Sequence, residues 1–285
     1  MKLAFLGDYS VEALDFAAAA GFDGMALSAW PGNATFKLGW EEGRAEEIRE
    51  AFSTRGLAIV ALGFYGNHLD LDPKAAAAAS AHFRKVMELA RRLDVGVVGT
   101  FAGNDPDKSL ADNMPAFKKV FSEYVRIADG LDLKIAVENC PMMHGQPFRG
   151  SNLAYTPAAW ELMFDAVPDS RLGLELDPSH LSWLMIDYVR AVRDFGPRIH
   201  HVHAKDTELF RDELGRVGVY GSGWWRYRVP GLGEVDWRMF IAALGDVGYD
   251  YALSVEHEDP VFHGPRHWEG LKLGLAHLSR FVPGA

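Results

Sequence analysis

The sequence predicts an α/β chain that folds as one (β/α)8 barrel, the TIM barrel, in a single domain over residues 1–285. Three observations predict this fold class. Short apolar runs with strand propensity occur eight times, segments with helical spacing lie between them, and several of these segments end in a glycine-containing joint. Strands that alternate with helices and are apolar on both faces indicate a parallel sheet, and eight such repeats close a barrel.

The expected strands are all short and apolar enough for burial on both faces. An open, doubly wound sheet is the main alternative, but no GxGxxG turn follows the first strand. In chain order the strands are KLAFLG (2–7), GMALSA (24–29), LAIVALGF (57–64), VGVVGTF (95–101), KIAVEN (134–139), LGLELD (172–177), RIHHVHA (198–204) and YALSVEH (251–257).

Helices are expected between these strands because apolar residues recur there at helical spacing. Glycines at 21, 56, 130 and 248 lie where four of the segments should stop, as is common at helix ends. The alanine run 75–79 belongs to a helix, and no linker divides the chain. The expected helices are 11–20, 45–55, 73–93, 114–131, 156–167 and 236–247.

The composition excludes several classes of protein. The formal net charge is -10 and no run of Lys and Arg exceeds two residues, so we expect neither nucleic acid nor a membrane as a partner. Cys140 is the one cysteine, which excludes an internal disulfide. The start MKLAFLGDYS has an apolar run that is too short for the core of a signal peptide, and no apolar run reaches membrane-spanning length. We therefore expect a soluble, cytoplasmic protein.

Ionisable residues stand at the carboxyl ends of four consecutive expected strands, the face where barrel enzymes carry their active sites. Glu138, Asp177 and Glu256 end the fifth, sixth and eighth strands. His201 and His203 share one face of the seventh strand because side chains alternate along a strand. Of the two, His203 is the expected ligand. Three carboxylates and one imidazole suit one divalent ion, such as Mn²⁺, Mg²⁺, Co²⁺ or Zn²⁺.

Each of these residues also has a purely structural explanation. Glu138 fits a salt bridge to an arginine, Asp177 before a proline fits a helix N-cap, and His203 fits a hydrogen-bonded histidine at the barrel rim. All of these explanations would have to hold at the equivalent position of neighbouring strands. Buried charges without partners are costly, so the joint metal site is the favoured hypothesis.

The same residues resemble those of the xylose isomerase-like barrels. The motifs are AVENC around Glu138, LDPSH around Asp177, HVHAKD around His203, LSVEHED around Glu256, and PGLGEVDW at 230–237. The resemblance covers essentially the whole chain and includes sugar phosphate isomerases and epimerases, tagatose 3-epimerase-type enzymes, inosose dehydratase and endonuclease IV. It implies one divalent metal ion, Mn²⁺ first, held by these four residues, with Glu138 and Glu256 also acting as catalytic acid and base.

Further residues near the strand ends are expected to contact a substrate. His180 lies just past the sixth strand, where the resembling family has a substrate-contacting histidine, although it also fits a helix cap. Lys205 fits stabilisation of an enolate, and Arg228 fits a clamp for an oxyanion or carboxylate, although it also fits stacking on aromatics. His68 and Trp30, with Phe64, Tyr65 and Phe101, fit the wall of a sugar pocket.

The segment 206–235 is expected to be a long loop with glycine-flanked tryptophans. Loops of this length in compact domains are usually functional. Two roles fit it equally: a lid over a sugar, or a surface that docks a second subunit in a homo-oligomer.

Four functions are compatible with this pattern. Favoured is a sugar isomerase or epimerase that removes a proton next to a carbonyl or hydroxyl polarised by the metal ion. A lyase or dehydratase acting on a keto-inositol or a 3-oxo-glycoside is the alternative, since the same proton abstraction precedes loss of a β-substituent. An apurinic endonuclease is disfavoured by the acidic charge, and a non-catalytic sugar-binding protein has little use for two acid/base carboxylates on a metal ion.

Overall fold

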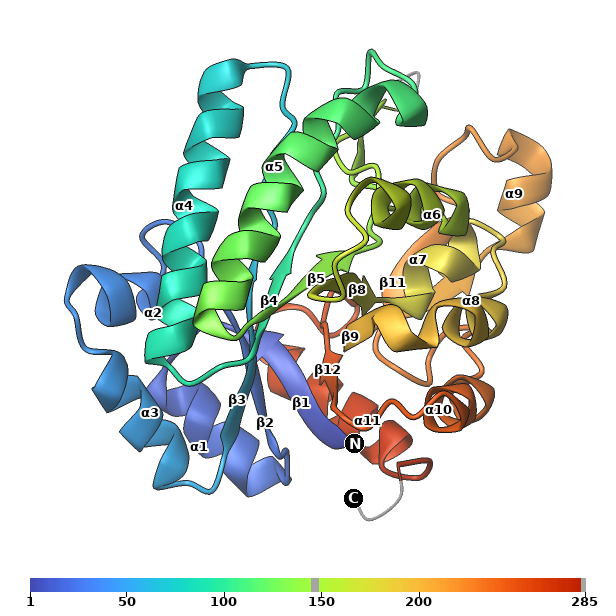
Figure 1. Cartoon of the computed structure of the whole chain (residues 1–285). Coiled ribbons are helices and arrows are strands. Elements are labelled where there is room, and N and C mark those ends of the chain that lie inside the picture. The colour runs from blue at the N-terminus through green and yellow to red at the C-terminus, as the bar shows by residue number, and fades with distance from the viewer. Residues whose placement is uncertain (145–148, 283–285) are drawn as a thin grey trace.

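The computed structural model describes residues 1–144 and 149–282, and its main sheet closes into the expected barrel (Figure 1). The eight barrel strands are β1 (Lys2–Gly7), β2 (Gly24–Ser28), β3 (Ala58–Phe64), β4 (Val97–Thr100), β5 (Lys134–Glu138), β8 (Leu172–Leu176), β9 (Ile199–Ala204) and β12 (Ala252–Val255). They are parallel and lie in the order β1-β12-β9-β8-β5-β4-β3-β2. Because β1 pairs with both β2 and β12, the open doubly wound alternative is wrong.

The outer layer consists of helices, and the six predicted ones are all present. They are α1 (Val11–Ala20), α3 (Ala45–Ser53), α4 (Pro73–Arg92), α5 (Leu110–Leu131), α6 (Pro157–Ala166) and α10 (Trp237–Asp246). Only α5 differs by more than two residues from its prediction. It begins earlier because Ser109 Oγ accepts a hydrogen bond from the Asp112 amide (3.1 Å) and caps an additional first turn.

Further helices, most of them short, were not predicted. Most have too few residues for a hydrophobic period to stand out. They are α2 (Ala34–Phe36), the π-helix Lys37–Glu41, α7 (Pro178–Trp183), α8 (Tyr188–Phe195), α9 (Arg211–Val217), α11 (His267–Leu278) and two 3-10 turns, Gly196–Arg198 and Gly264–Arg266.

The core has two parts that differ in residue size. Large side chains such as Phe83, Trp160 and Trp237 fill the space between strands and helices. A smaller cluster of alanines and valines, which includes Ala136 and Ala252, forms a separate group contributed by the barrel strands. Ala136 lies in β5 and Ala252 in β12. Two residues further along these strands, on the same face, the side chains are polar: Glu138 and Ser254. The barrel interior therefore changes from apolar to ionisable towards the carboxyl ends of its strands.

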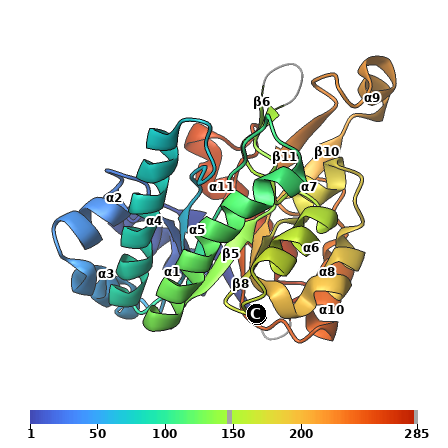
Figure 2. The same cartoon turned by 45° about the horizontal axis from the view of Figure 1, so that its top comes forward.

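The segment 206–235 is not a structureless loop. It contains an antiparallel hairpin, β10 (Asp206–Leu209) and β11 (Trp225–Arg228), with α9 between its strands, and α9 projects away from the barrel in Figure 2. Asp206 ties the base of this hairpin down by accepting hydrogen bonds from the amides of Gly231 (2.9 Å) and Val235 (3.0 Å). A Cβ at Gly233 would lie 2.3 Å from Asp206 Oδ1, so this close approach requires glycine.

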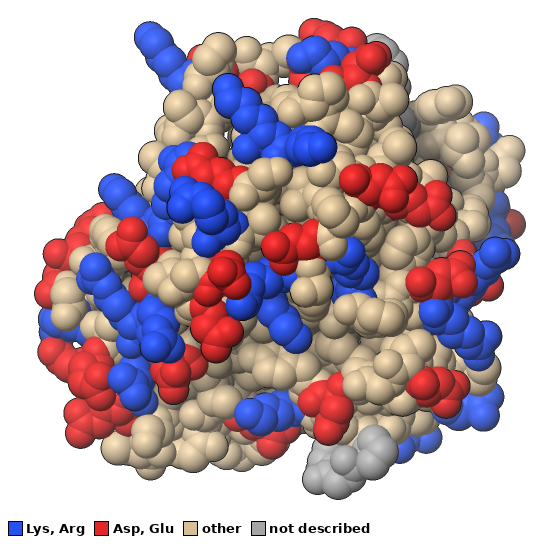
Figure 3. Space-filling model, in the orientation of Figure 1, with Lys and Arg blue, Asp and Glu red and all other residues tan. Residues whose placement is uncertain are grey.

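The surface carries charges of both signs. On the face shown in Figure 3, Lys and Arg lie interspersed with Asp and Glu. Within residues 1–144 and 149–282, no helix is both long and apolar enough to cross a membrane. A second small hairpin, β6 (Met143–His144) with β7 (Arg149–Gly150), lies in the connection that follows β5.

Candidate metal centre

The four predicted ligands converge at the carboxyl ends of the strands. Glu138 is the last residue of β5, His203 lies in β9, and Asp177 and Glu256 directly follow β8 and β12. One donor atom from each of the four lies within 4.8 Å of the others. His203 Nδ1 is 2.9 Å from Glu138 Oε1 and 3.1 Å from Glu256 Oε2. Residues up to 118 positions apart in the chain thus form one compact group of donors.

Asp177 uses its two carboxylate oxygens differently. Oδ1 accepts a hydrogen bond from the Ser179 amide (2.8 Å) and caps α7. Oδ2 is buried without a hydrogen bond to any described residue, and lies 3.3 Å from His180 Nε2 and 3.4 Å from Lys205 Nζ. The Asn139 side chain bonds to the backbone N–H (2.7 Å) and C=O (2.9 Å) of Asp177, which fixes the end of β8 against the end of β5. The cap and the ligand role are therefore compatible in one residue.

The donor set fits a divalent cation. Asp177 Oδ2 and His180 Nε2 are buried and lack hydrogen bonds among the described residues, although buried polar atoms are normally satisfied. Three carboxylates this close repel one another unless a positive charge lies among them. A mixed oxygen and nitrogen set of this kind suits Mn²⁺, Mg²⁺, Co²⁺ or Zn²⁺.

Neighbouring charges shift the pKa values of the ligands. Burial works to raise the pKa of Glu256, but the positive charges of Lys205 and His203 outweigh it and hold this pKa well below its usual value. Burial works to lower the pKa of His203, yet the carboxylates of Glu175 and Glu256 raise it well above its usual value. Without a bound cation, a proton on His203 balances part of the negative charge. A metal ion that binds there displaces this proton.

Lys205 and His180 lie at the centre, as the sequence suggested. Lys205 is 1% exposed, and its Nζ is 2.8 Å from Glu256 Oε2 and 3.4 Å from Asp177 Oδ2. His180 Nε2 lies 3.3 Å from Asp177 Oδ2 and 3.9 Å from Glu138 Oε1. Asp177, not His180, provides the helix cap. Both side chains are therefore placed to meet a molecule bound at the ligands.

Three other predicted substrate residues have protein partners of their own. His68 is buried, with its Nε2 2.8 Å from Thr100 Oγ1 and its Nδ1 3.0 Å from the Tyr124 hydroxyl. Arg228 bonds to Glu208 and, through Nε, to Asp259 (2.7 Å).

Trp30 is 42% exposed and packs edge-on against Phe64. The described contacts of His68, Arg228 and Trp30 do not include the four ligands, so their substrate roles stay predictions.

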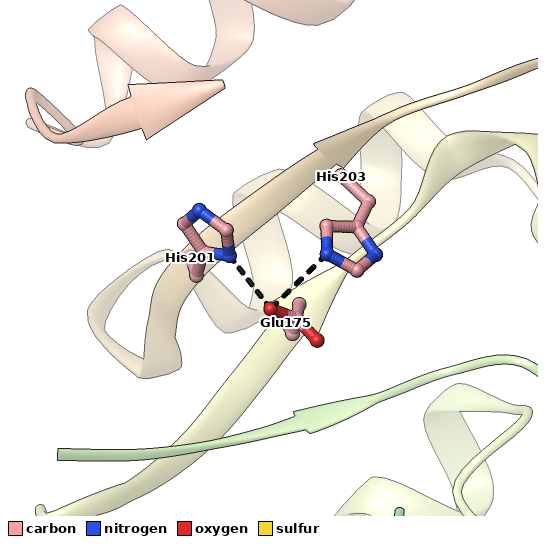
Figure 4. A group of neighbouring side chains, drawn as sticks. All are labelled: Glu175, His201 and His203. Atoms are coloured by element: carbon pink, nitrogen blue, oxygen red, sulfur yellow. Dashed lines mark hydrogen bonds and ion pairs between the residues drawn. The ribbon is translucent and has the colours of Figure 1, made fainter. Parts of the chain in front are cut away.

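Two side chains at the centre were not singled out from the sequence. Glu175 lies in β8, two residues before Asp177, and contacts both His201 and His203 (Figure 4). Its signal was present, since a glutamate inside an apolar strand is unusual.

The other is Tyr227, whose hydroxyl lies 2.9 Å from His180 Nδ1. Tyr227 reaches the centre only because the β10–β11 hairpin folds back over α7, which no local pattern predicts. Tyr65, an expected pocket wall, lies with its hydroxyl 3.4 Å from His203 Nε2.

Comparisons of the sequence with known proteins find several relatives. A YfiH protein of Bacillus subtilis (strain 168), whose function is uncharacterised, is 28% identical over an alignment of 303 positions that covers 91% of this chain and 93% of that protein. Inosose dehydratase of Geobacillus thermodenitrificans (strain NG80-2) is 27% identical over 230 residues and covers 76% of this chain and 75% of its own.

Solved structures share the fold at lower identity. The IOLI protein with a bound zinc atom superimposes with a TM-score of 0.77 at 19% identity, over 99% of this chain and 100% of that one. D-psicose 3-epimerase in the presence of D-fructose superimposes with a TM-score of 0.73 at 18% identity, over 100% of both chains. The sequence profile of the xylose isomerase-like TIM barrel matches residues 14–280. The chain therefore belongs to the xylose isomerase-like TIM barrel family.

Proposed function

We propose that the protein is a divalent-metal-dependent isomerase or epimerase of a sugar or sugar derivative, with Mn²⁺ as the first candidate ion. The observation that carries this proposal is that the carboxylates of Glu138 and Glu256 both lie close to the same atom, His203 Nδ1, at 2.9 and 3.1 Å. In the barrel order, β12 and β5 lie on either side of the neighbouring strands β9 and β8. Two carboxylates that reach one site from two directions suit proton removal from one side and return from the other.

In the proposed reaction one glutamate removes the proton from the carbon next to a carbonyl. The C–H bonding pair moves into the carbon–carbon bond and the carbonyl π pair moves to oxygen, which gives an enediolate. The divalent ion, when bound, polarises that oxygen. The second glutamate, which carries a proton before the reaction begins, then donates it to the opposite face of the same carbon, giving an epimer. When it donates the proton to the neighbouring carbon instead, the proton of the adjacent hydroxyl passes to the former carbonyl oxygen as the new carbonyl forms, giving an isomer. Lys205 holds the pKa of Glu256 low and so keeps this glutamate ionised.

A dehydratase is the second candidate, and the inosose dehydratase relatives favour it specifically. The first step is identical, but the enediolate then expels a hydroxyl group from the next carbon instead of taking up a proton. The departing oxygen needs a proton donor. The Lys205 ammonium and His180, which both lie beside Asp177, are the described side chains placed to provide one.

We further propose a neutral substrate, without a phosphate group. Among the cations on the segments that follow the barrel strands, those with carboxylate partners are Arg44, Lys108, Arg149, Lys205, Arg211, Arg216, Arg226, Arg228 and Arg266. Within the described residues, the exposed Lys37 is the one cation of these segments for which no carboxylate partner is found. A phosphate dianion would have to break existing ion pairs next to a cluster of carboxylates.

Deuterium exchange tests the reaction. The Mn²⁺-loaded protein is incubated in D₂O with ketohexoses, an inosose and a 3-oxo-glucoside, and products are followed by NMR and mass spectrometry. We expect deuterium at the carbon next to the carbonyl, with an epimer or isomer as product. Loss of water with an unsaturated product would instead establish the dehydratase. If no substrate takes up deuterium and none gives a product, proton transfer is refuted.

Single variants assign the two carboxylates. Glu138→Gln and Glu256→Gln should each abolish exchange, because each removes one acid/base group while preserving volume. Glu88→Gln, at an exposed position of α4, is the matched control and should exchange at the wild-type rate. An unchanged rate in either active-site variant would remove that residue from the mechanism. A ketohexose phosphate should react with a kcat/KM at least about tenfold below that of the free sugar.

A further inference from the structure

We infer that Glu175 is a positioning residue that orients the His203 imidazole and thereby sets the affinity of the centre for its metal ion. The inference rests on the proposed metal site. Glu175 lies in β8, two residues before Asp177, and is 1% exposed. Of the four candidate ligands it contacts His203, so we assign its effect on the centre to that imidazole.

A single carboxylate oxygen of Glu175 lies between two imidazoles (Figure 4). Oε1 is 2.6 Å from His201 Nδ1 and 3.3 Å from His203 Nε2. The other oxygen, Oε2, is buried without a hydrogen bond among the described residues. A buried carboxylate is costly unless positive charge or N–H donors face it. The two histidines, together with the Tyr65 hydroxyl that hydrogen-bonds to this carboxylate, make Glu175 tolerable there.

The two nitrogens of His203 face different groups. Nδ1 faces Glu138 and Glu256, whereas Nε2 faces Glu175 at 3.3 Å, with the Tyr65 hydroxyl 3.4 Å away. Nδ1 is therefore the atom that meets a cation, and Nε2 carries the N–H that donates to Glu175. A carboxylate in this position fixes the tautomer and ring orientation of a metal-binding histidine and increases its basicity.

Residues of other strands hold the Glu175 carboxylate in place. Across the barrel, β4 has a glycine at position 99, where a Cβ would lie 2.8 and 2.9 Å from the two carboxylate oxygens. On the other side, Ser254 Oγ of β12 lies 2.9 Å from His201 Nε2 and fixes the imidazole that donates to Glu175. β4, β8, β9 and β12 thus all contribute to the position of one carboxylate.

The same three side chains, Glu175, His201 and His203, are also close enough together to hold a second cation. Three contacts disfavour this. The 2.6 Å approach of His201 to Glu175 is a formed hydrogen bond, and Ser254 engages the other nitrogen of His201. His203 would also have to bridge two cations. We therefore assign the group as support for one metal ion, and the stoichiometry of binding tests this choice.

The first test is the metal affinity of Glu175→Gln, which removes the charge and preserves the volume. Titration calorimetry with Mn²⁺ and Zn²⁺, on protein stripped with a chelator, should show one site in the wild type. The variant should bind about 10- to 100-fold more weakly. Glu88→Gln, the same substitution at an exposed position of α4, is the matched control and should bind within about twofold of the wild type.

The second test is spectroscopic and begins with the wild-type protein. In Zn²⁺-loaded wild-type protein with ¹⁵N-labelled histidine, the His203 Nε2 proton should be observed and protected from exchange, with Nδ1 unprotonated. Glu175→Gln should shift this proton resonance, which a purely structural role would not do.

Four outcomes would contradict the inference. Equal affinity in Glu175→Gln, or a proton on His203 Nδ1, would overturn it and leave the proposed function standing. Two bound ions in the wild type would assign the group as a second site. No metal binding by the wild type would overturn the proposed function as well.

Discussion

Asp177 shows how one side chain can have a structural and a chemical role at once. Its Oδ1 caps α7 and its Oδ2 faces the other ligands. The two roles respond differently to substitution, because asparagine caps helices about as well as aspartate but carries no charge. This difference allows the roles to be separated by experiment.

We predict that Asp177→Asn retains the metal-free stability and loses metal binding. The melting temperature without metal should stay within about 2 °C of the wild type, because the cap is preserved. Affinity for Mn²⁺ should fall at least about tenfold, since an anionic ligand is replaced by a neutral one. Asp177→Ala is the companion variant, which should also lose about 1 kcal/mol of unfolding free energy with the cap. Tight metal binding by Asp177→Asn would exclude Asp177 as a ligand.

Tyr227 is a second residue for which two effects can be separated, one on substrate binding and one on metal affinity. Its hydroxyl lies 2.9 Å from His180 Nδ1, and its ring lies 4.5 Å from Lys205 Nζ. Tyr227→Phe removes the hydroxyl and keeps the ring. We predict that KM for the substrate rises several-fold, because His180 is no longer held in place, while Mn²⁺ affinity is unchanged. Equal changes in both quantities would place Tyr227 among the groups that support the metal ion instead.

At the scale of helices and strands, the prediction from sequence was accurate where the pattern is local and repeated. All eight barrel strands and six helices follow from apolar periodicity. Pairing between distant segments does not follow from it. β10 and β11 pair across α9, and Trp225 stacks on Trp183 from a different connection at a centroid distance of 4.6 Å. Tyr227 is placed by these contacts, so it could not be predicted, whereas Glu175 carried a local signal within its own strand.

The connection between β3 and α4 contains a histidine, His68, that makes the folding stability depend on pH. His68 joins Thr100 at the end of β4 to Tyr124 in α5, and burial lowers its pKa to about 3. The folded state therefore keeps His68 neutral, while the unfolded chain takes up a proton below about pH 6.5. Since the unfolded state binds more protons, stability falls as the pH falls from about 6.5 towards 3.

We predict that His68→Gln reduces this pH dependence. One such histidine contributes a slope of about 1.4 kcal/mol per pH unit, developed fully between about pH 5.5 and 4. Urea denaturation of both proteins across this range measures the difference in slope. The absolute stability of the variant does not enter the comparison. Parallel curves for the two proteins would show that His68 is already protonated in the folded state.

For the whole molecule, metal binding and folding are thermodynamically linked. A cation that binds only the folded chain at 100 times its Kd stabilises it by about 2.7 kcal/mol. For a chain of this size the melting temperature should rise by roughly 5 °C. Calorimetry with Mn²⁺ and with a chelator measures the shift, and Asp177→Asn is the control that should show almost none. A wild-type melting temperature indifferent to both additions would contradict a tight metal site.

The position of the ligands along the chain has a consequence for biosynthesis. The four proposed ligands begin at Glu138 and end at Glu256, which directly follows β12, the strand that joins β9 to β1 and closes the barrel. A chain emerging from the ribosome therefore cannot assemble all four donors until its last strand has docked. Capture of the ion is then a late event, and a molecule loaded with metal is one whose barrel is already complete. Metal content would thus distinguish finished molecules from stalled or truncated ones in a cell.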